Sequence, residues 1–278
     1  MSSAERAASP AILYGTAWKG ERTAGLVERA IDLGFRGVDT ACQPRHYDEA
    51  GVGRGIGACL ARGLRRAELY VQTKFTPLGG QDPRRVPYDP RAPLPEQIEQ
   101  SCAASLRNLG VGYLDAWLLH SPISPLADML EAWQAMEAAV DSGAVRALGI
   151  SNCDDPAVLA ALWRAARIKP TIVQNRFHRK TGYDVGVRAF CTRHGLRYQS
   201  FWTLSANADV LRSAELRAMA ERHHGSAEQV FLAYLTALGI TPLTGTCSEE
   251  HMRDDLAIFR LSLSDTENAA IARLLGPR

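Results

Sequence analysis

The fold is decided by one stretch, Tyr113-Leu114-Asp115-Ala116-Trp117-Leu118-Leu119-His120-Ser121-Pro122. Five of the six residues before the histidine are apolar, which is typical of a strand buried on both faces. The run ends on a titratable side chain and breaks at Pro122, as the strands of an α/β barrel do where they open onto the active-site rim. On this stretch alone, a buried strand whose His120 only bonds to backbone is the alternative.

The same pattern of short apolar runs separated by amphipathic segments continues along the whole chain. The predicted strands are residues 12–18, 35–41, 69–74, 113–122, 147–152, 171–175, 196–202 and 241–246. The predicted helices are residues 21–33, 49–63, 96–109, 126–142, 156–166, 184–194, 209–222, 226–238, 248–259 and 265–275. Eight strands alternating with helices, without a linker or a shift in composition, predict a parallel sheet covered by helices. We expect a (β/α)8 TIM barrel, with residues 1–278 as a single domain.

A doubly wound sheet is the alternative to the barrel. That fold binds nucleotides through a GxGxxG turn directly after its first strand. Here the first strand leads into residues 15–20, GTAWKG, which lack this spacing. A GxGxG is present at Gly51, Gly53 and Gly55, but it follows no strand and lies inside a predicted helix. We interpret it as a structural glycine cluster.

Composition and charge exclude several classes of protein. The 32 basic and 30 acidic side chains are spread along the 278 residues and leave a net charge of +2, so no basic stripe indicates nucleic-acid binding. No segment reaches the roughly 18 uncharged apolar residues that a membrane span needs. The cytoplasm is the expected compartment, and we expect a monomer or a weak homo-oligomer.

Six cysteines lie far apart in the sequence. They form no CxxC pair and no Cys/His spacing suited to zinc, so no metal site is predicted and the thiols are expected to be reduced and mostly buried. They are Cys42, Cys59, Cys102, Cys153, Cys191 and Cys247. The clustered ligands that a metal-dependent barrel hydrolase needs are missing as well.

Residues 76–95 form the longest segment without a regular pattern. They contain six prolines and two adjacent glycines, too many breakers for a helix or a central strand. Loops of this length within a compact domain are usually functional. We therefore expect residues 76–95 to contribute to substrate selection.

Polar and titratable side chains follow the predicted strands in a defined order, with Asp39 and Tyr47, then Lys74, then His120. The chain resembles the aldo-keto reductase family over residues 14–275. The resemblance rests on the ordered set Gly34-Phe35-Arg36-Gly37-Val38-Asp39-Thr40-Ala41, Gln72-Thr73-Lys74, Leu118-Leu119-His120, Gly149-Ile150-Ser151-Asn152 and Gln174-Asn175. It implies a (β/α)8 barrel with a catalytic tetrad of Asp39, Tyr47, Lys74 and His120.

The chemistry of the implied tetrad is consistent with carbonyl reduction. Hydride addition leaves charge on oxygen, and a tyrosine with a pKa of about 10 is a reluctant proton donor. We expect Lys74 to lower the pKa of Tyr47, and Asp39 to hold the lysine. His120 would orient the carbonyl oxygen. Alternatively, Asp39 and Lys74 are an ordinary buried ion pair and Tyr47 is a packed aromatic.

The assignment of the acid depends on an unusual spacing. The family tyrosine normally lies closer after the aspartate, whereas here Cys42-Gln43-Pro44-Arg45-His46 intervenes. Tyr47 is identified by the Asp48-Glu49 that follows it. His46 is a neighbouring rival for the role of acid.

The resemblance also implies a nicotinamide cofactor. Ser151, Asn152 and Gln174 match positions that bind the nicotinamide carboxamide, for which amides and a hydroxyl are suitable partners. Phe201 replaces the tyrosine that stacks on the nicotinamide ring, and Trp202 competes for that role. The complete expected cofactor-binding set is Thr16, Ala17, Asp39, Ser151, Asn152, Gln174, Phe201, Trp202, Leu204, Thr246, His251 and Asp255.

The match is weakest at the site for the 2′-phosphate. Many family members have a lysine-serine pair after strand eight and an arginine a few residues later. The equivalents here are Gly245-Thr246 and His251, so both strong cations are missing. Thr246 can still bond a phosphate, and His251 or Arg253 can approach it. We expect NADP(H) with a weakened preference over NAD(H).

These features predict an NAD(P)H-dependent oxidoreductase that reduces an aldehyde or ketone to an alcohol, with Tyr47 as proton donor. The expected partner is a small-molecule carbonyl or alcohol substrate, bound by Trp18, Tyr47, His120 and Tyr88, with Phe177 and Trp202 as further aromatic candidates. The alternative is a cofactor-binding regulatory or interaction protein on the same barrel.

Overall fold

A closed eight-stranded parallel barrel forms the centre of the molecule. The computed structural model describes residues 9–276. The strands are hydrogen-bonded in sequence order, and β1 closes the barrel against β8. They are β1 (Leu13–Gly15), β2 (Gly37–Asp39), β3 (Tyr70–Phe75), β4 (Ala116–Leu119), β5 (Leu148–Ser151), β6 (Ile172–Arg176), β7 (Arg197–Phe201) and β8 (Thr241–Thr244). The predicted (β/α)8 barrel is confirmed.

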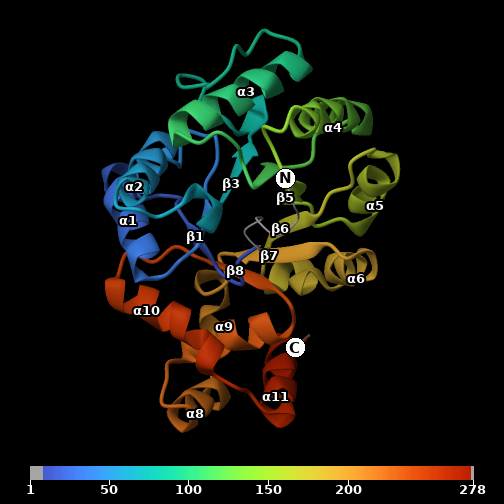
Figure 1. The fold of residues 1–278 in the computed structure, drawn as a ribbon. Coiled ribbons are helices and arrows are strands. Elements are labelled where there is room, and N and C mark those ends of the chain that lie inside the picture. Colours follow the sequence, from blue (N-terminus) through green and yellow to red (C-terminus); the bar gives the residue numbers. More distant parts are fainter. Residues whose placement is uncertain (1–8, 277–278) are drawn as a thin grey trace.

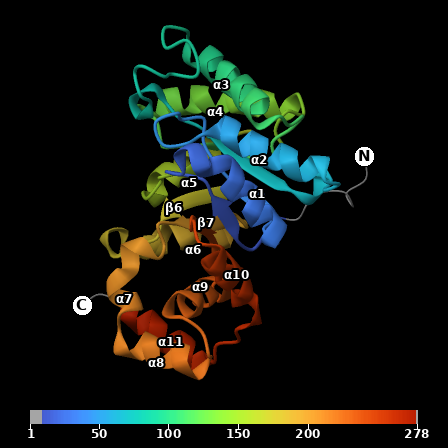
Figure 2. The same cartoon turned by 90° about the vertical axis from the view of Figure 1, so that its left-hand side faces the viewer.

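Helices surround the barrel (Figure 1), and α8 and α11 lie together at one end of the molecule (Figure 2). The helices are α1 (Thr23–Leu33), α2 (Glu49–Ala61), α3 (Leu94–Leu109), α4 (Leu126–Asp141), α5 (Pro156–Ala165), α6 (Val185–His194), α7 (Ala208–Leu211), α8 (Ala214–Arg222), α9 (Ala227–Ala237), α10 (Glu249–Ala257) and α11 (Asp265–Leu275). The predicted helix over residues 209–222 is in fact two, because Ser213 caps α8 by accepting a hydrogen bond from the Leu216 backbone.

Apolar side chains occupy two layers. The larger core lies between the sheet and the helices and includes Trp117, Leu119 and Val173. A smaller cluster fills the barrel interior with Leu13, Tyr70, Ala116, Leu118 and Ile172. Because successive side chains of a strand point to opposite faces, the inward row of β3 runs from Tyr70 through residues 72 and 74, which places polar side chains inside the barrel.

The three glycines of the GxGxG permit close helix packing. All lie within α2, and a Cβ at Gly53 would overlap the carbonyl oxygen of Asn108, while one at Gly55 would lie 2.5 Å from the Ala24 carbonyl oxygen. The glycines therefore let α2 approach α1 and α3. Their structural interpretation is confirmed.

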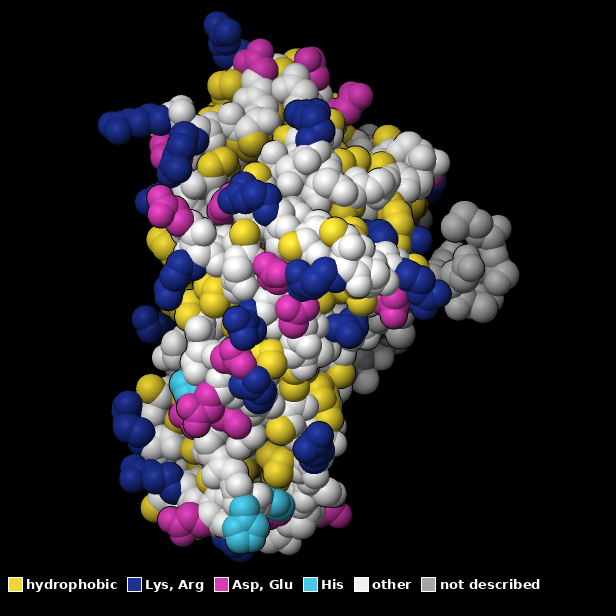
Figure 3. Space-filling model, turned by 60° about the vertical axis from the view of Figure 1, so that its left-hand side comes forward, with side chains coloured by type: hydrophobic (Ala, Val, Ile, Leu, Met, Phe, Trp, Pro, Cys, Tyr) yellow, Lys and Arg dark blue, Asp and Glu magenta, His cyan; other side chains and the backbone are white. Residues whose placement is uncertain are grey.

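The remaining composition-based expectations concern the thiols and the surface. All six cysteines are free, and five of them are buried, as predicted. Within residues 9–276, no helix is both long and apolar enough to cross a bilayer. Across that same range no group of three or more His, Cys, Asp or Glu side chains is arranged to hold a metal. On the face in Figure 3, basic and acidic side chains are interspersed.

Candidate active site

A cavity of about 810 Å³ opens at the carboxyl ends of the barrel strands, within the range that small-molecule and cofactor sites occupy. Most of the predicted site residues line it. They are Thr16, Ala17, Trp18, Asp39, Tyr47, His120, Ser151, Asn152, Gln174, Phe201, Trp202, Leu204, Thr246, His251 and Asp255. Lys74 is 1% exposed and bonds to Asp39 at the barrel centre.

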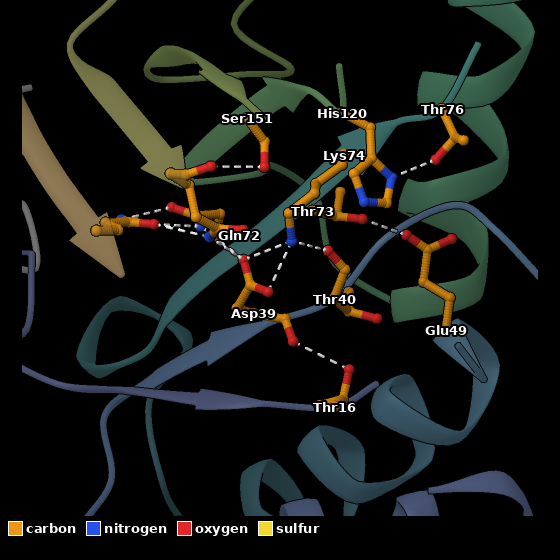
Figure 4. A network of polar contacts seen from close by, with 12 residues as sticks. Thr16, Asp39, Thr40, Glu49, Gln72, Thr73, Lys74, Thr76, His120 and Ser151 are labelled. Carbon is orange, nitrogen blue, oxygen red and sulfur yellow. Dashed lines mark hydrogen bonds and ion pairs between the residues drawn. The ribbon is translucent and has the colours of Figure 1, made fainter. Parts of the chain in front are cut away.

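Asp39, at the end of β2, and Lys74, on β3, form a buried ion pair. The Lys74 ammonium donates to both carboxylate oxygens of Asp39, at 2.8 and 2.7 Å, and to the Thr40 carbonyl at 2.9 Å (Figure 4). Burial lowers the pKa of Lys74, and the Asp39 carboxylate opposes that shift. The pairing fixes the ammonium in one position at the bottom of the cavity.

Three glutamines form an amide network beside Asp39, and two of them donate to its carboxylate. Gln72 and Gln174 donate to Asp39 Oδ1 at 2.6 and 2.9 Å. Both amides also donate to Gln199 Oε1 at 2.8 Å, and Gln199 Nε2 returns a hydrogen bond of 3.0 Å to Gln72. This amide network connects β2, β3, β6 and β7 across the barrel interior. Because a carboxylate only accepts hydrogen bonds, it fixes which end of each amide faces Asp39.

Tyr47 lies between Lys74 and His120. Its ring centroid is 5.7 Å from the Lys74 ammonium and 6.1 Å from the centroid of the His120 ring. Among the described residues its hydroxyl makes no hydrogen bond, and the side chain lines the cavity. The rival His46 also lines the cavity, but its ring stacks on Trp18 with centroids 3.8 Å apart.

The expectation that Lys74 lowers the pKa of Tyr47 is wrong for this structure. Burial raises the pKa of Tyr47, and the negative charge of Asp39 raises it further. The physical reason is that the Lys74 ammonium is neutralised by direct contact with both oxygens of Asp39. Tyr47 therefore remains protonated throughout the neutral pH range.

His120 is held in a neutral state. Burial, together with the nearby Lys74 charge, lowers the pKa of His120 to about 3. Its Nδ1 lies 2.6 Å from the Thr76 hydroxyl (Figure 4). If that hydroxyl donates, Nε2 carries the ring proton and can donate into the cavity.

The three residues expected at the carboxamide site are held by their neighbours. Ser151 donates to the Gln174 backbone carbonyl at 2.7 Å, and Asn152 donates through Nδ2 to the His120 carbonyl at 2.8 Å. Gln174 uses its Nε2 on Asp39 and Gln199. The amide nitrogens are therefore engaged within the protein, and the side-chain oxygens of Asn152 and Gln174 are the ends available to a ligand.

The other end of the cavity lies between β8 and α10. The Thr246 hydroxyl accepts from the Ser248 backbone at 3.1 Å, so its own proton is free to be donated. Burial raises the pKa of Asp255 to about 6. Lys19 donates to the Gly245 carbonyl, and a Cβ on Gly245 would lie 3.5 Å from the Lys19 ammonium. Lys19 thus places a cation near position 245, where many family members have the lysine that follows strand eight.

Two aromatic residues and one loop do not contribute to the cavity, contrary to expectation. Tyr88 is 6% exposed, packs on Phe75 and donates to the Thr76 carbonyl at 2.9 Å, so it anchors the loop to the barrel. Phe177 is fully buried against Tyr183. No residue of 76–95 lines the cavity, and Gln81 holds the loop by donating to the Cys42 and Thr76 carbonyls.

Four residues of the site were not predicted from the sequence. Gln72 and Gln199 are the missing members of the amide network, and Lys19 and Arg176 are cations that line the cavity. The available signals were positional. Gln72 and Arg176 lie two residues from Lys74 and Gln174, hence on the same inward face of their strands.

Comparisons with known proteins identify the family of the chain. The family model "Aldo/keto reductase family" matches residues 12–206. The chain is 28% identical to 2,5-diketo-D-gluconic acid reductase B of a Corynebacterium strain, over 92% of this chain and 85% of that protein. It is 29% identical to glyoxal reductase of Bacillus subtilis, over 89% and 82%. The structure of the Bombyx mori aldo-keto reductase AKR2E4 in complex with NADP matches with a TM-score of 0.80 and 25% identity, over 95% of this chain and 89% of that one. The chain belongs to the aldo/keto reductase family of oxidoreductases.

Proposed function

We propose that the protein reduces an aldehyde or ketone to an alcohol, with NADP(H) as hydride donor and Tyr47 as proton donor. One observation carries the proposal. Tyr47 and His120 line one cavity, with the Lys74–Asp39 pair directly beside the Tyr47 ring. A relative's structure contains NADP, which supports the choice of cofactor.

The residues present fit a nicotinamide cofactor. Asn152 and Gln174 offer amide oxygens that can accept from a carboxamide NH₂ group, and Phe201 offers a half-buried ring on the cavity wall. Trp202 is 52% exposed and packs on Arg176, so Phe201 is the better stacking partner. When bound, the dihydronicotinamide supplies the hydride, which no side chain can donate.

The protein's own residues manage the proton. Neutral His120 donates a hydrogen bond to the carbonyl oxygen and orients it, while Tyr47 keeps its proton until charge develops on that oxygen. The proton moves from the Tyr47 hydroxyl to the developing alkoxide, which is the stronger base, while the Lys74 ammonium beside the Tyr47 ring stays paired with Asp39. Asp39 and the amide network keep that ammonium in place.

Two variants test the proton donor. We expect Tyr47→Phe to lower kcat for NADPH-dependent aldehyde reduction by at least roughly 100-fold, the range of general acid catalysis. His46→Ala changes the rival on the same loop and should retain most of kcat. If Tyr47→Phe reduced the aldehyde with the kcat of the natural protein, or if His46→Ala lost more of kcat than Tyr47→Phe, Tyr47 would not be the proton donor.

The cofactor preference follows from the side chains at the β8 end, among which Lys19 is the cation. Thr246, His251 and Lys19 line this part of the cavity, but the negatively charged Asp255 also lies there. We therefore propose NADP(H) use with a weakened preference over NAD(H). Fluorescence titration of both reduced cofactors measures the ratio of the two Kd values, and a much tighter NADH would contradict the proposal.

A further inference from the structure

Arg176 is the last residue of β6 and points into the cavity. On this strand Ile172 packs inside the barrel and Gln174 bonds to Asp39 at its centre. Arg176 continues this inward row at the carboxyl end of the strand and lines the cavity. It therefore presents a positive charge one step closer to the mouth than Gln174.

The Arg176 guanidinium has no anionic partner in the part of the chain that the structure describes. Within residues 9–276 it forms no ion pair, and its buried Nε lacks a hydrogen-bond acceptor. By contrast, Arg66 and Arg146 both bond to Asp115 elsewhere in the molecule. Because Nε is closed off, a ligand in the cavity would meet the terminal Nη1 and Nη2 groups, which form no hydrogen bond within the described residues and can donate to an anion.

Trp202 forms a platform for this guanidinium. The centroid of its ring lies 3.9 Å from the central carbon of Arg176. Trp202 has a φ of 55°, a left-handed conformation that is costly for a bulky side chain and is usually retained for function. Stacking on the face of the guanidinium leaves its edge free for the two parallel hydrogen bonds that a carboxylate accepts.

The position of Arg176 favours the substrate over the cofactor as the source of that anion. The proposed phosphate end of the cofactor lies at β8, where Lys19 already supplies a cation. Arg176 is on β6, with all of β7 between it and β8. We propose that Arg176, held on Trp202, binds a carboxylate carried by the substrate, so that the enzyme prefers aldehyde or keto acids; this rests on the proposed function.

A matched substrate pair tests the proposal. In the Arg176→Met variant, kcat/KM for 4-carboxybenzaldehyde should fall at least roughly tenfold more than for its neutral methyl ester, as expected for a lost charged hydrogen bond. Arg45→Met is the control, because this exposed arginine next to His46 does not line the cavity. It should not discriminate between the two substrates.

The remaining outcomes are distinguishable. Equal losses for acid and ester would overturn the proposal, and a raised Kd for NADPH without substrate discrimination would assign the guanidinium to the cofactor diphosphate. Calorimetric titration with benzoate against benzamide measures the same contact without turnover. Benzoate binding by the natural protein that Arg176→Met abolishes would support the carboxylate site even if no aldehyde were reduced. Equal binding of both probes would refute it.

Discussion

Replacing Lys74 by methionine is expected to destabilise the protein because it leaves the Asp39 carboxylate buried without its cation. Methionine has a similar volume, so the change removes charge rather than packing. The variant loses three hydrogen bonds, two to Asp39 and one to the Thr40 carbonyl. Asp39 is only 2% exposed and cannot recover this interaction from bulk water.

The size of the effect follows from what remains around Asp39. Removing one partner of a buried ion pair costs about 3–5 kcal/mol. Gln72 and Gln174 still donate to Asp39 Oδ1, at 2.6 and 2.9 Å, so we expect a loss near the lower limit, about 3 kcal/mol. The double variant Asp39→Asn/Lys74→Met has no charge at these two buried positions and keeps a side-chain oxygen that can accept from both glutamine amides. It should therefore lose less free energy of unfolding than Lys74→Met alone.

Urea-induced unfolding followed by tryptophan fluorescence measures Lys74→Met, the single variant Asp39→Asn and the double variant, since the chain contains five tryptophans. The double-mutant cycle should give a coupling free energy of about 2 kcal/mol or more between the two positions. A cost below about 1 kcal/mol for Lys74→Met would refute the reasoning. The reasoning would also be refuted if the losses of unfolding free energy in the two single variants added up to the loss in the double variant.

Three further predictions concern the surroundings of the site. Because the pKa of His120 is lowered to about 3, the profile of kcat/KM against pH should show no ionisation of His120 between pH 5 and 8, and the loss due to its protonation should appear only as the pH approaches 3. The variant Thr76→Val, which frees Nδ1 of His120, should lower kcat about tenfold. Burial raises the pKa of Asp255 from its usual 3.8 to about 6, so ionisation of this carboxyl destabilises the folded state as the pH rises from 4 through 6. In urea unfolding, Asp255→Asn should therefore be more stable than the natural protein at pH 8, by up to about 3 kcal/mol, and the difference should be smaller at pH 4.5. Gln72→Leu removes a hydrogen-bond donor to Asp39, so it should lower the free energy of unfolding by about 1–3 kcal/mol in the same assay and lower kcat more than it raises KM. Unchanged kcat and stability would show that the amide network is dispensable.

The sequence alone was sufficient for the barrel and for most of the cavity wall. Strands and helices have different hydrophobic periods, so their order along the chain could be predicted directly. In a parallel barrel all strands end at the same rim, and side chains such as Asp39 and His120 therefore had to converge once the strands were identified. The same rule brought Ser151 and Gln174 to that rim.

Tertiary structure alone decided the contacts between these side chains. The hydrogen bonds between Gln72 and Gln199 join residues 127 positions apart, and no local pattern encodes such a pairing. The raised pKa of Tyr47 depends on how deeply it is buried and on which group neutralises Lys74. Tyr88 was misplaced because an aromatic in a loop can face either a cavity or the core. Burial and register are properties of the closed barrel, whereas periodicity and strand order are properties of the chain itself.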